Sequence, residues 1–329
     1  MDLSDISKLG DWEVPEYYLK ISTLDVHTGG EPLRIIMDGF PFLKGTTVLE
    51  KRSYVREHYD HLRTSLMWEP RGHSDMYGAI IVEPNSAQAD FGVIFLHNEG
   101  YSTGCGHAVL GLTKTFVETG LIKSMGQTTD VVMDVPSGMV HAEALSENGN
   151  VTGARFRNVP SFVQCLDHEV DVTDYGTIKY DLAFGGAFYV FVNVSEIGMD
   201  ASPEQSASLI SAGMAIRKAV AEAVEMDHPN EPEMNHLYGT IFFADSNKPE
   251  VHSRHVCIFA DGQIDRCPTG TGRPGSTYSP THGWATRIGL SRPPGRCGDS
   301  CISTSTVRRR PPPVRPRSPG DPRWVRSRG

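Results

Sequence analysis

The sequence predicts an α+β protein built from two similar halves. Alternating or continuous runs of apolar, β-branched and aromatic residues, typical of strands, fill residues 18–97 and much of 130–197. Only two long segments, 106–119 and 202–224, carry the 3.6-residue spacing of a helix. A strand-rich stretch followed by one long helix therefore occurs once in each half, and 329 residues suit about two domains.

The first half begins with strands separated by turn signals. Thr28-Gly29-Gly30 stands between two strand-like segments, and Pro84-Asn85-Ser86 separates AIIVEP from ADFGVIFLHN. Glycine, proline and asparagine favour tight turns because of their backbone preferences. We therefore expect residues 18–97 to be β-rich, with Asp11–Tyr17 as an entry segment.

The first helix is expected from about Gly106 to Thr119. Gly120 is a natural C-terminal stop for it. The helix would begin directly after Cys105. Its apolar residues at helical spacing are Ala108, Val109, Leu112, Phe116 and Val117.

The second half repeats this order of strands and one helix. In Ser202-Pro203-Glu204-Gln205 the serine suits a helix cap, the proline the first helical position and the glutamine a capping box. We expect that helix to end near Val224. The strand-like segments of this half are 130–165, 181–197, 237–246 and 251–260.

The charge divides the chain at about residue 272. The net charge is −9, but the segment 273–329 holds 12 Arg, no Lys and two acidic residues, so it carries +10 and the preceding part −19. The same segment holds 10 of the 22 prolines and shows no sustained period. We expect it to be a disordered basic tail, because it lacks the apolar residues that offset ordering entropy. The acidic body argues against a nucleic-acid partner.

Composition restricts the class of protein further. With 39% apolar and 22% charged residues, the chain resembles soluble globular proteins, and no run approaches the roughly 18 to 20 apolar residues of a membrane helix. The acidic start resembles neither a signal peptide nor a transit peptide. Six cysteines without framework spacing suggest reduced thiols. We expect a cytoplasmic protein without a membrane partner.

Cys105 is a candidate base or nucleophile. A thiol at a helix N-terminus faces unpaired N–H groups and the positive end of the helix dipole, which should lower its pKa. Gly106 permits close approach of a ligand, and His107 adds a titratable neighbour. A buried structural cysteine is the alternative interpretation.

The loop 265–272, DRCPTGTG, is the second candidate. Glycine-rich loops that lead into a helix offer backbone N–H groups to a carboxylate or phosphate, and Asp265 could accept from an amine. An ordinary turn is the alternative, and a dinucleotide site is disfavoured because Pro274 interrupts the helix that it needs. The His and Cys residues lack metal-ligand spacing, so no metal is expected.

Six segments, taken in order over about residues 18–272, resemble the proline racemase family. They are 25–34 (DVHTGGEPLR), 69–79 (EPRGHSDMYGA), 104–107 (GCGH), 136–138 (PSG), 181–189 (DLAFGGAFY) and 265–272 (DRCPTGTG). The resemblance implies two pseudo-symmetric lobes of the diaminopimelate-epimerase-like type, each a mixed sheet around a central helix, with the site between them. It also implies a cofactor-independent enzyme that acts on proline or a hydroxyproline, usually as a homodimer.

The resemblance also divides the chain. It implies an N-terminal entry segment over 1–17, a first lobe with Cys105 over 18–130, a second lobe over 131–272 and the basic tail over 273–329. Members of the family continue past the glycine-rich loop into a helix and further strands. Because Pro274 follows that loop at once, we expect the second lobe to be incomplete.

The family's racemases and epimerases place two cysteines on opposite faces of the substrate. Cys105 corresponds to the first, whereas Thr269 stands at the second position and Cys267 lies two residues earlier. An alcohol has too high a pKa to replace the second thiol, so two-base racemisation should fail. A cysteine base with a threonine opposite resembles trans-3-hydroxy-L-proline dehydratases, which form Δ1-pyrroline-2-carboxylate and water. Cys105 and Thr269 are therefore the expected catalytic residues, and Thr269 could hydrogen-bond the departing hydroxyl.

The resemblance assigns further roles. The N–H groups of Gly106, His107, Gly270 and Thr271 would hold the carboxylate of an imino acid, and Asp265, with His107 nearby, its ring nitrogen. Two alternatives stay open. One is a proline or hydroxyproline racemase or epimerase, and the other is an inactive family member whose tail is an interaction segment.

Overall fold

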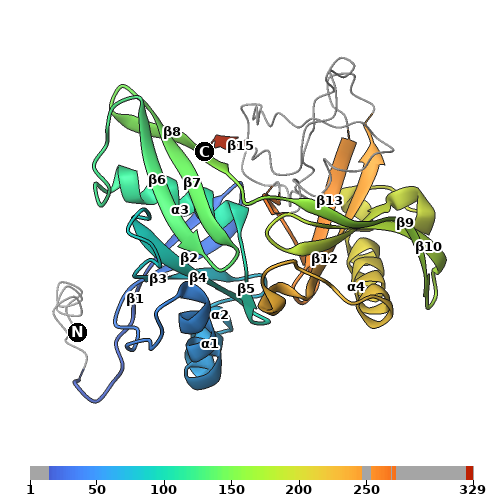
Figure 1. Cartoon of the computed structure of the whole chain (residues 1–329), viewed down its shortest axis with the longest axis horizontal. Helices are drawn as coiled ribbons and strands as arrows, with labels where there is room; N and C mark the ends of the chain where they lie inside the picture. Colours follow the sequence, from blue (N-terminus) through green and yellow to red (C-terminus); the bar gives the residue numbers. More distant parts are fainter. Residues whose placement is uncertain (1–14, 247–252, 268, 272–323, 329) are drawn as a thin grey trace, which may run out of the picture.

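The computed structural model describes residues 15–246, 253–267, 269–271 and 324–328. Two separate sheets divide the molecule into two lobes that lie side by side, as Figure 1 shows. Each lobe has one long helix packed on its sheet, α3 in the first and α4 in the second. The predicted α+β fold with two lobes is therefore confirmed.

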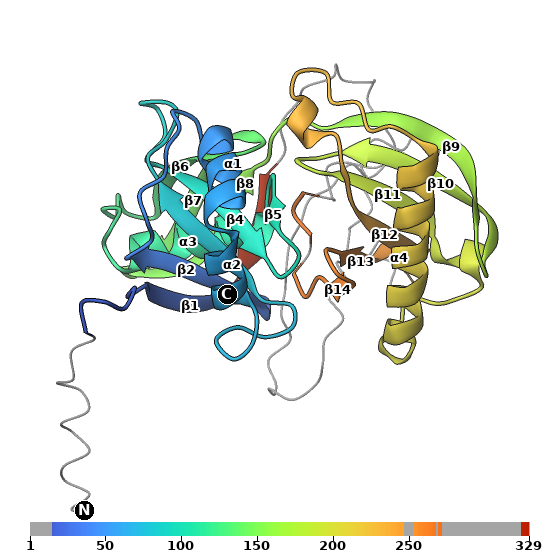
Figure 2. The same ribbon diagram turned by 90° about the horizontal axis from the view of Figure 1, so that it is seen from below.

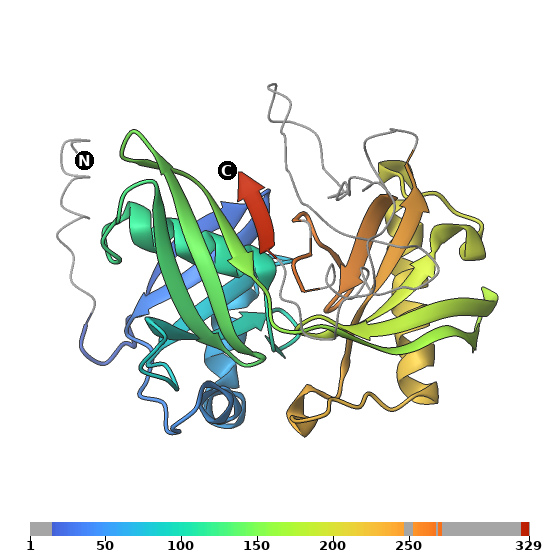
Figure 3. The same ribbon diagram turned by 45° about the horizontal axis from the view of Figure 1, so that its top comes forward.

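The first lobe is a nine-stranded mixed sheet curled around α3 (Gly106–Glu118). The helix packs on β1, β2, β7 and β8, which lie toward the two ends of the sheet, and Figure 3 shows it enclosed by them. The sheet is antiparallel apart from the pairs β2–β3 and β4–β6. Its strands are β1 (Ser22–Thr28), β2 (Glu31–Asp38), β3 (Tyr77–Val82), β4 (Phe91–His97), β5 (Tyr101–Ser102), β6 (Thr128–Val135), β7 (Gly138–Glu147), β8 (Asn150–Arg157) and β15 (Trp324–Arg328).

Two helices of the first lobe, α1 (Val48–His58) and α2 (Asp60–Met67), were not predicted. The inward face of α1 includes Lys51 and Arg52, which donate to the Glu83 carbonyl and the Glu233 carboxylate, so the sequence shows no apolar helical period there. A local signal did exist. Thr47 and Glu50 form a reciprocal capping box at the start of α1.

The second lobe is a six-stranded sheet with α4 (Ser206–Ala223) along one face, as Figure 2 shows. The helix connects β11 to β12, which pair in parallel, as a crossover between parallel strands requires. The sheet order is β14 (Gln263–Ile264), β13 (Ser253–Phe259), β12 (Leu237–Asp245), β11 (Phe188–Asn193), β10 (Gly176–Phe184) and β9 (Phe162–Val172). Short 3₁₀ turns cover Val194–Ile197, Pro203–Gln205 and Pro232–Met234.

The two long helices lie where the sequence predicts them, with one correction. The predicted cap Ser202 begins the 3₁₀ turn Pro203–Gln205 rather than α4 itself, and its side chain makes no capping hydrogen bond. The α-helical bonds start only at Ser206. Proline at the first position is compatible with either kind of helix, so the sequence could not distinguish them.

The sheets divide between Arg157 and Phe162, and not at residue 131 as predicted. Strands β6, β7 and β8 belong to the first sheet because β7 and β8 pack on α3. The predicted disordered tail also differs at its end, where β15 pairs antiparallel with β8. The remainder of that tail, and the helix expected after the glycine-rich loop, lie outside the described residues. Among the helices that the structure describes, none is long and apolar enough to cross a membrane.

Candidate active site

Cys105 lies at the junction between the β5 segment and α3. It is the N-cap residue of the helix, with extended backbone, and its Sγ accepts a hydrogen bond from the Ala108 N–H at 3.4 Å. The side chain is buried, with 7% of the residue exposed. The sequence therefore places the thiol at the helix N-terminus as predicted.

The predicted fall in the pKa of Cys105 is wrong for this structure. Burial raises the pKa of the thiol far above its ordinary value, and the Ala108 N–H opposes this only in part. The neighbouring carboxyls of Asp265 and Glu31 raise it further. Desolvation of a thiolate outweighs one helix-terminal donor, so the thiol is protonated in this closed site.

His107 contacts the same thiol. Its Nε2 lies 3.2 Å from the Pro32 carbonyl oxygen, which can only accept, so Nε2 carries the proton. Nδ1 is then an acceptor, and it lies 3.1 Å from Cys105 Sγ. Burial lowers the pKa of His107 to about 3, which keeps the imidazole neutral. The pair is thus a neutral thiol facing a neutral imidazole.

Asp265 organises the loop that the second lobe contributes. Its Oδ1 accepts from the Cys267 N–H at 2.8 Å, and its Oδ2 accepts from Thr269 Oγ1 at 2.6 Å. Thr269 has a φ of 45°, in the left-handed region, so its position depends on this hydrogen bond. Cys267 is 2% exposed and does not line the pocket described below.

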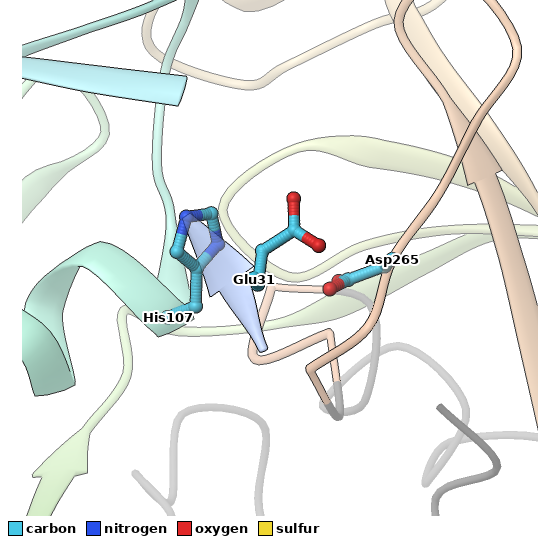
Figure 4. A group of neighbouring side chains, drawn as sticks. All are labelled: Glu31, His107 and Asp265. Carbon is cyan, nitrogen blue, oxygen red and sulfur yellow. The ribbon is translucent and has the colours of Figure 1, made fainter. Parts of the chain in front are cut away.

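Glu31, at the start of β2, belongs to the site although its position in the sequence predicts no role for it. It is fully buried and joins the two lobes, because its carboxyl accepts from the Gln263 side-chain amide and from the Arg266 N–H at 3.0 Å. Figure 4 shows its carboxyl group between His107 and Asp265. The only signal in the sequence was an acidic residue directly after Gly29-Gly30 and before an apolar strand.

Two carboxyls this close do not both ionise readily. Burial raises the pKa of Glu31 to about 9, with the charge of Asp265 adding to the effect. Burial raises the pKa of Asp265 to about 6, although its hydrogen bonds from Thr269 and Cys267 oppose that. At neutral pH the pair therefore holds one proton, on Glu31, and Asp265 is the anion.

Glu31, His107 and Asp265 could in principle hold a metal ion. One ligand atom from each lies within 4.8 Å of the others. However, both carboxylate oxygens of Glu31 and Asp265 already accept from protein donors, and both nitrogens of His107 face partners. The group therefore matches a hydrogen-bonded acid pair.

One pocket between the lobes brings the predicted residues together. Its lining includes all seven of them, namely Cys105, Gly106, His107, Asp265, Thr269, Gly270 and Thr271. Three tyrosines from elsewhere in the chain, Tyr77, Tyr189 and Tyr238, were not predicted to take part. Their spacing in the sequence carries no signal, because β3, β11 and β12 bring them together.

The lobes meet at two of these glycines. A Cβ on Gly106 would lie 2.6 Å from Gly270 Cα, and a Cβ on Gly270 would lie 2.8 Å from Gly106 Cα. Asn158, in the connection between the sheets, donates to the Gly185 carbonyl at 2.6 Å and to the Gly270 carbonyl at 3.3 Å. Only glycine permits this approach of α3 to the loop.

Comparisons with known proteins agree with this geometry. The proline racemase family model matches residues 23–276. A trans-3-hydroxy-L-proline dehydratase of Colwellia psychrerythraea is 51% identical over 78% of this chain and 72% of its own length, and that of Homo sapiens is 44% identical over 77% and 73%. A 3-hydroxyproline 2-epimerase of Burkholderia multivorans is 42% identical over 78% and 76%.

A solved structure is similar over most of the chain. The hydroxyproline epimerase of Agrobacterium vitis, with bound trans-4-hydroxy-L-proline, superposes with a TM-score of 0.81. It is 25% identical, and the match covers 95% of this chain and 90% of that one. The two-lobed arrangement around the pocket is therefore shared with that enzyme.

Proposed function

Because the chain belongs to the proline racemase family, we propose that it is a hydro-lyase that converts trans-3-hydroxy-L-proline into Δ1-pyrroline-2-carboxylate and water without a cofactor. The observation that carries this proposal is the pairing of one thiol, Cys105, with the alcohol of Thr269 in a single pocket. A lone thiol can remove an α-proton, but an alcohol opposite cannot readily return one to the other face.

The substrate carboxylate would bind where α3 meets the loop. The N-terminus of α3 presents the backbone N–H groups of Gly106 and His107 together with the positive end of the helix dipole. The N–H groups of Gly270 and Thr271 belong to the same pocket. Asp265, the anion of the carboxyl pair, would take the positively charged ring nitrogen, while Glu31 remains neutral beside it.

The base would be Cys105, activated through His107. Nδ1 of His107 lies 3.1 Å from Sγ and would accept the thiol proton once a bound, charged substrate changes the surroundings of the pair. The thiolate would then remove the proton from C2 of the substrate. The electron pair of the broken C–H bond forms the C2=C3 double bond, and the C3–O bond breaks. The resulting enamine tautomerises to Δ1-pyrroline-2-carboxylate, and the oxygen leaves as water.

Thr269 weakens the case for a racemase or epimerase. Its hydroxyl already donates to Asp265 Oδ2, and the pKa of an alcohol is far too high for proton exchange with carbon at neutral pH. The 42% identity to an epimerase nevertheless makes inversion at C2 the competing reaction to be measured.

We further propose that the enzyme acts as a homodimer in the cytoplasm. The family resemblance supports the dimer, and light scattering of the purified protein would test it. A reducing compartment suits a mechanism that depends on a reduced Cys105 thiol. Fractionation of the source cells would test the location.

The function is tested by incubating the full chain with trans-3-hydroxy-L-proline. We expect pyrroline carboxylate, trapped with a colour reagent, and no substrate inverted at C2. Cys105→Ser should lower the rate by at least about 1,000-fold, because an alcohol cannot serve as the base.

Cys165→Ser is the matched control, since this half-buried cysteine of β9 does not line the pocket. It should keep wild-type turnover. Inversion without dehydration would assign the chain to the epimerases instead. No reaction from folded protein would favour an inactive family member.

A further inference from the structure

Tyr238, at the start of β12, places a hydroxyl in the pocket that has no structural partner. The residue is 7% exposed, and within the described part of the chain its hydroxyl has no partner at full hydrogen-bond geometry, although the Tyr77 and Ser102 hydroxyls lie near enough to oppose the rise in its pKa. It is one of the residues that line the pocket around Cys105 and Thr269. A buried hydroxyl without a partner costs free energy, so its retention in a ligand pocket points to a ligand atom.

Aromatic neighbours fix the Tyr238 ring. Phe259 stacks on it at 5.6 Å between ring centroids, and Tyr189 packs edge-on at 5.8 Å. On the side of the first lobe, the imidazole of His97 lies edge-on at 6.0 Å. The ring comes from the second lobe but reaches the first, and its hydroxyl is held in one direction.

The other polar groups on the Cys105 side of the pocket are already engaged. The Tyr77 hydroxyl hydrogen bonds Ser102 Oγ, and His107 faces Cys105 and the Pro32 carbonyl. Tyr238 lines the same pocket as Cys105, and its ring packs on His97, which in turn stacks on Tyr77. Burial raises the pKa of Tyr238, which keeps its hydroxyl protonated. It is therefore available as a donor to a ligand close to Cys105.

The stereochemistry of the substrate selects this side of the pocket. In trans-3-hydroxy-L-proline the hydroxyl lies opposite the carboxylate and hence on the same ring face as the α-hydrogen. The face that presents the α-hydrogen to Cys105 therefore also presents the departing hydroxyl. The Thr269 hydroxyl already donates to Asp265 Oδ2, so it is not free to donate to the departing oxygen.

We propose that Tyr238 is a catalytic residue of the dehydration, whose hydroxyl donates a hydrogen bond to the C3 oxygen of the substrate as it leaves. This inference rests on the proposed function and assigns the group that distinguishes elimination from simple proton exchange. Cys105 takes the α-proton, the C2=C3 bond forms and the C3–O bond breaks. The departing oxygen then takes that proton from the Cys105 thiol on the same face, which yields water and restores the thiolate. Tyr238 keeps its own proton throughout.

The test is Tyr238→Phe, which retains the ring and removes only the hydroxyl. Loss of a hydrogen bond to an oxygen that gains negative charge should lower kcat/KM for dehydration by about 10- to 100-fold. The matched control is Tyr180→Phe, a buried tyrosine of β10 that does not line the pocket. It should retain the wild-type kcat/KM.

A second readout separates departure of the hydroxyl from removal of the proton. In D2O, substrate recovered from the Tyr238→Phe reaction should contain more α-deuterium per turnover than substrate recovered from the wild type. Proton removal continues in that variant while C–O cleavage is slowed. The α-deuterium is measured by proton NMR of the unreacted substrate.

The possible results of these experiments distinguish the role of Tyr238 from the proposed function. Dehydration by Tyr238→Phe within threefold of wild type overturns it, as does a loss of dehydration without the rise in deuterium per turnover. Failure of the variant to fold would contradict the premise that the hydroxyl has no structural partner. A wild type that does not dehydrate the substrate overturns the proposed function itself, whereas an active wild type with an unaffected variant overturns only the role of Tyr238.

Discussion

The chemistry of individual residues in this site is set by which of them hold protons. Burial keeps both Cys105 and His107 neutral, and Nδ1 of His107 is the acceptor nearest to hand for the thiol proton in the proposed mechanism. The carboxyl pair stores one more proton on Glu31 and leaves a single negative charge on Asp265. The pocket thus carries one negative charge, which suits the positively charged ring nitrogen of the proposed substrate.

Thr269 decides which reaction the thiol can complete. Thr269→Cys should introduce inversion at C2, because a second thiol can then deliver a proton to the opposite face. Chiral chromatography should show the inverted hydroxyproline, which wild type should not form. The φ of 45° is strained for threonine and no worse for cysteine, so the melting temperature should change by less than about 3 °C.

The double variant Cys105→Ser/Thr269→Cys is the control for that experiment. It should neither dehydrate nor invert the substrate, because inversion needs both thiols. An active single variant whose product contains no inverted substrate would contradict the two-face argument.

At the level of elements, the site depends on how closely the N-terminus of α3 approaches the 265–271 loop. Gly106 and Gly270 touch through their backbones, and Asn158 holds the Gly270 carbonyl from the connection between the sheets. The proposed carboxylate site would therefore be made by both lobes and by neither alone. Its geometry changes with any displacement of one lobe.

Gly106→Ala should separate these elements. The added Cβ would lie 2.6 Å from Gly270 Cα, so the loop must shift. A displacement of about 1 Å at a catalytic site can cost about 100-fold, and we expect a loss of that size in kcat/KM. Gly100→Ala is the control, because a Cβ there meets no atom within 4 Å. Equal activity of the two variants would refute the close-approach argument.

The helices show which kinds of element can be predicted from a sequence pattern. The helix α3 was predictable because its buried residues repeat at helical spacing and because Gly120, at a φ of 77°, ends it. The helix α1 was not, because the inward Lys51 and Arg52 side chains are satisfied by partners distant in sequence, Glu83 and Glu233. On the inward face of α1, hydrogen bonds to distant residues take the place of the apolar side chains by which a sequence pattern identifies a helix.

At the scale of the whole molecule, a small number of buried polar contacts join the lobes. Glu31 of the first lobe accepts from Gln263 and Arg266 of the second, and Arg52 pairs with Glu233 at 2.8 Å. Breaking such contacts exposes the pocket between the sheets. Glu31 therefore contributes both to the stability of the contact between the lobes and to the proposed active site.

The raised pKa of Glu31 makes stability depend on pH. Its folded pKa of about 9 lies above the ordinary 4.5. The contribution of Glu31 to stability is therefore fully present below about pH 4.5 and is lost as the pH rises toward 9. Over that range the free energy of unfolding should fall by at most about 1.4 kcal/mol per pH unit.

Glu31→Gln tests this, because an amide does not ionise. The melting temperature of the variant minus that of wild type should increase steadily from pH 5 to pH 9. The exposed Glu147→Gln is the control and should give a constant difference. If the melting temperatures of Glu31→Gln and wild type differed by the same amount at every pH, Glu31 would already be ionised in the folded protein.

The sequence by itself determined the α+β class, the two long helices, the family and the seven residues that meet in the pocket, because short motifs and helical periods are local properties of a chain. Tertiary structure decided the rest. The sheets divide near residue 160, and pairing of β6, β7 and β8 around α3 sets that boundary. Burial of Cys105 reverses the pKa shift that its helix position suggests. Glu31 and Tyr238 join the site because the two lobes pack against each other there. A local sequence pattern does not show which distant strands come together or how much water they exclude.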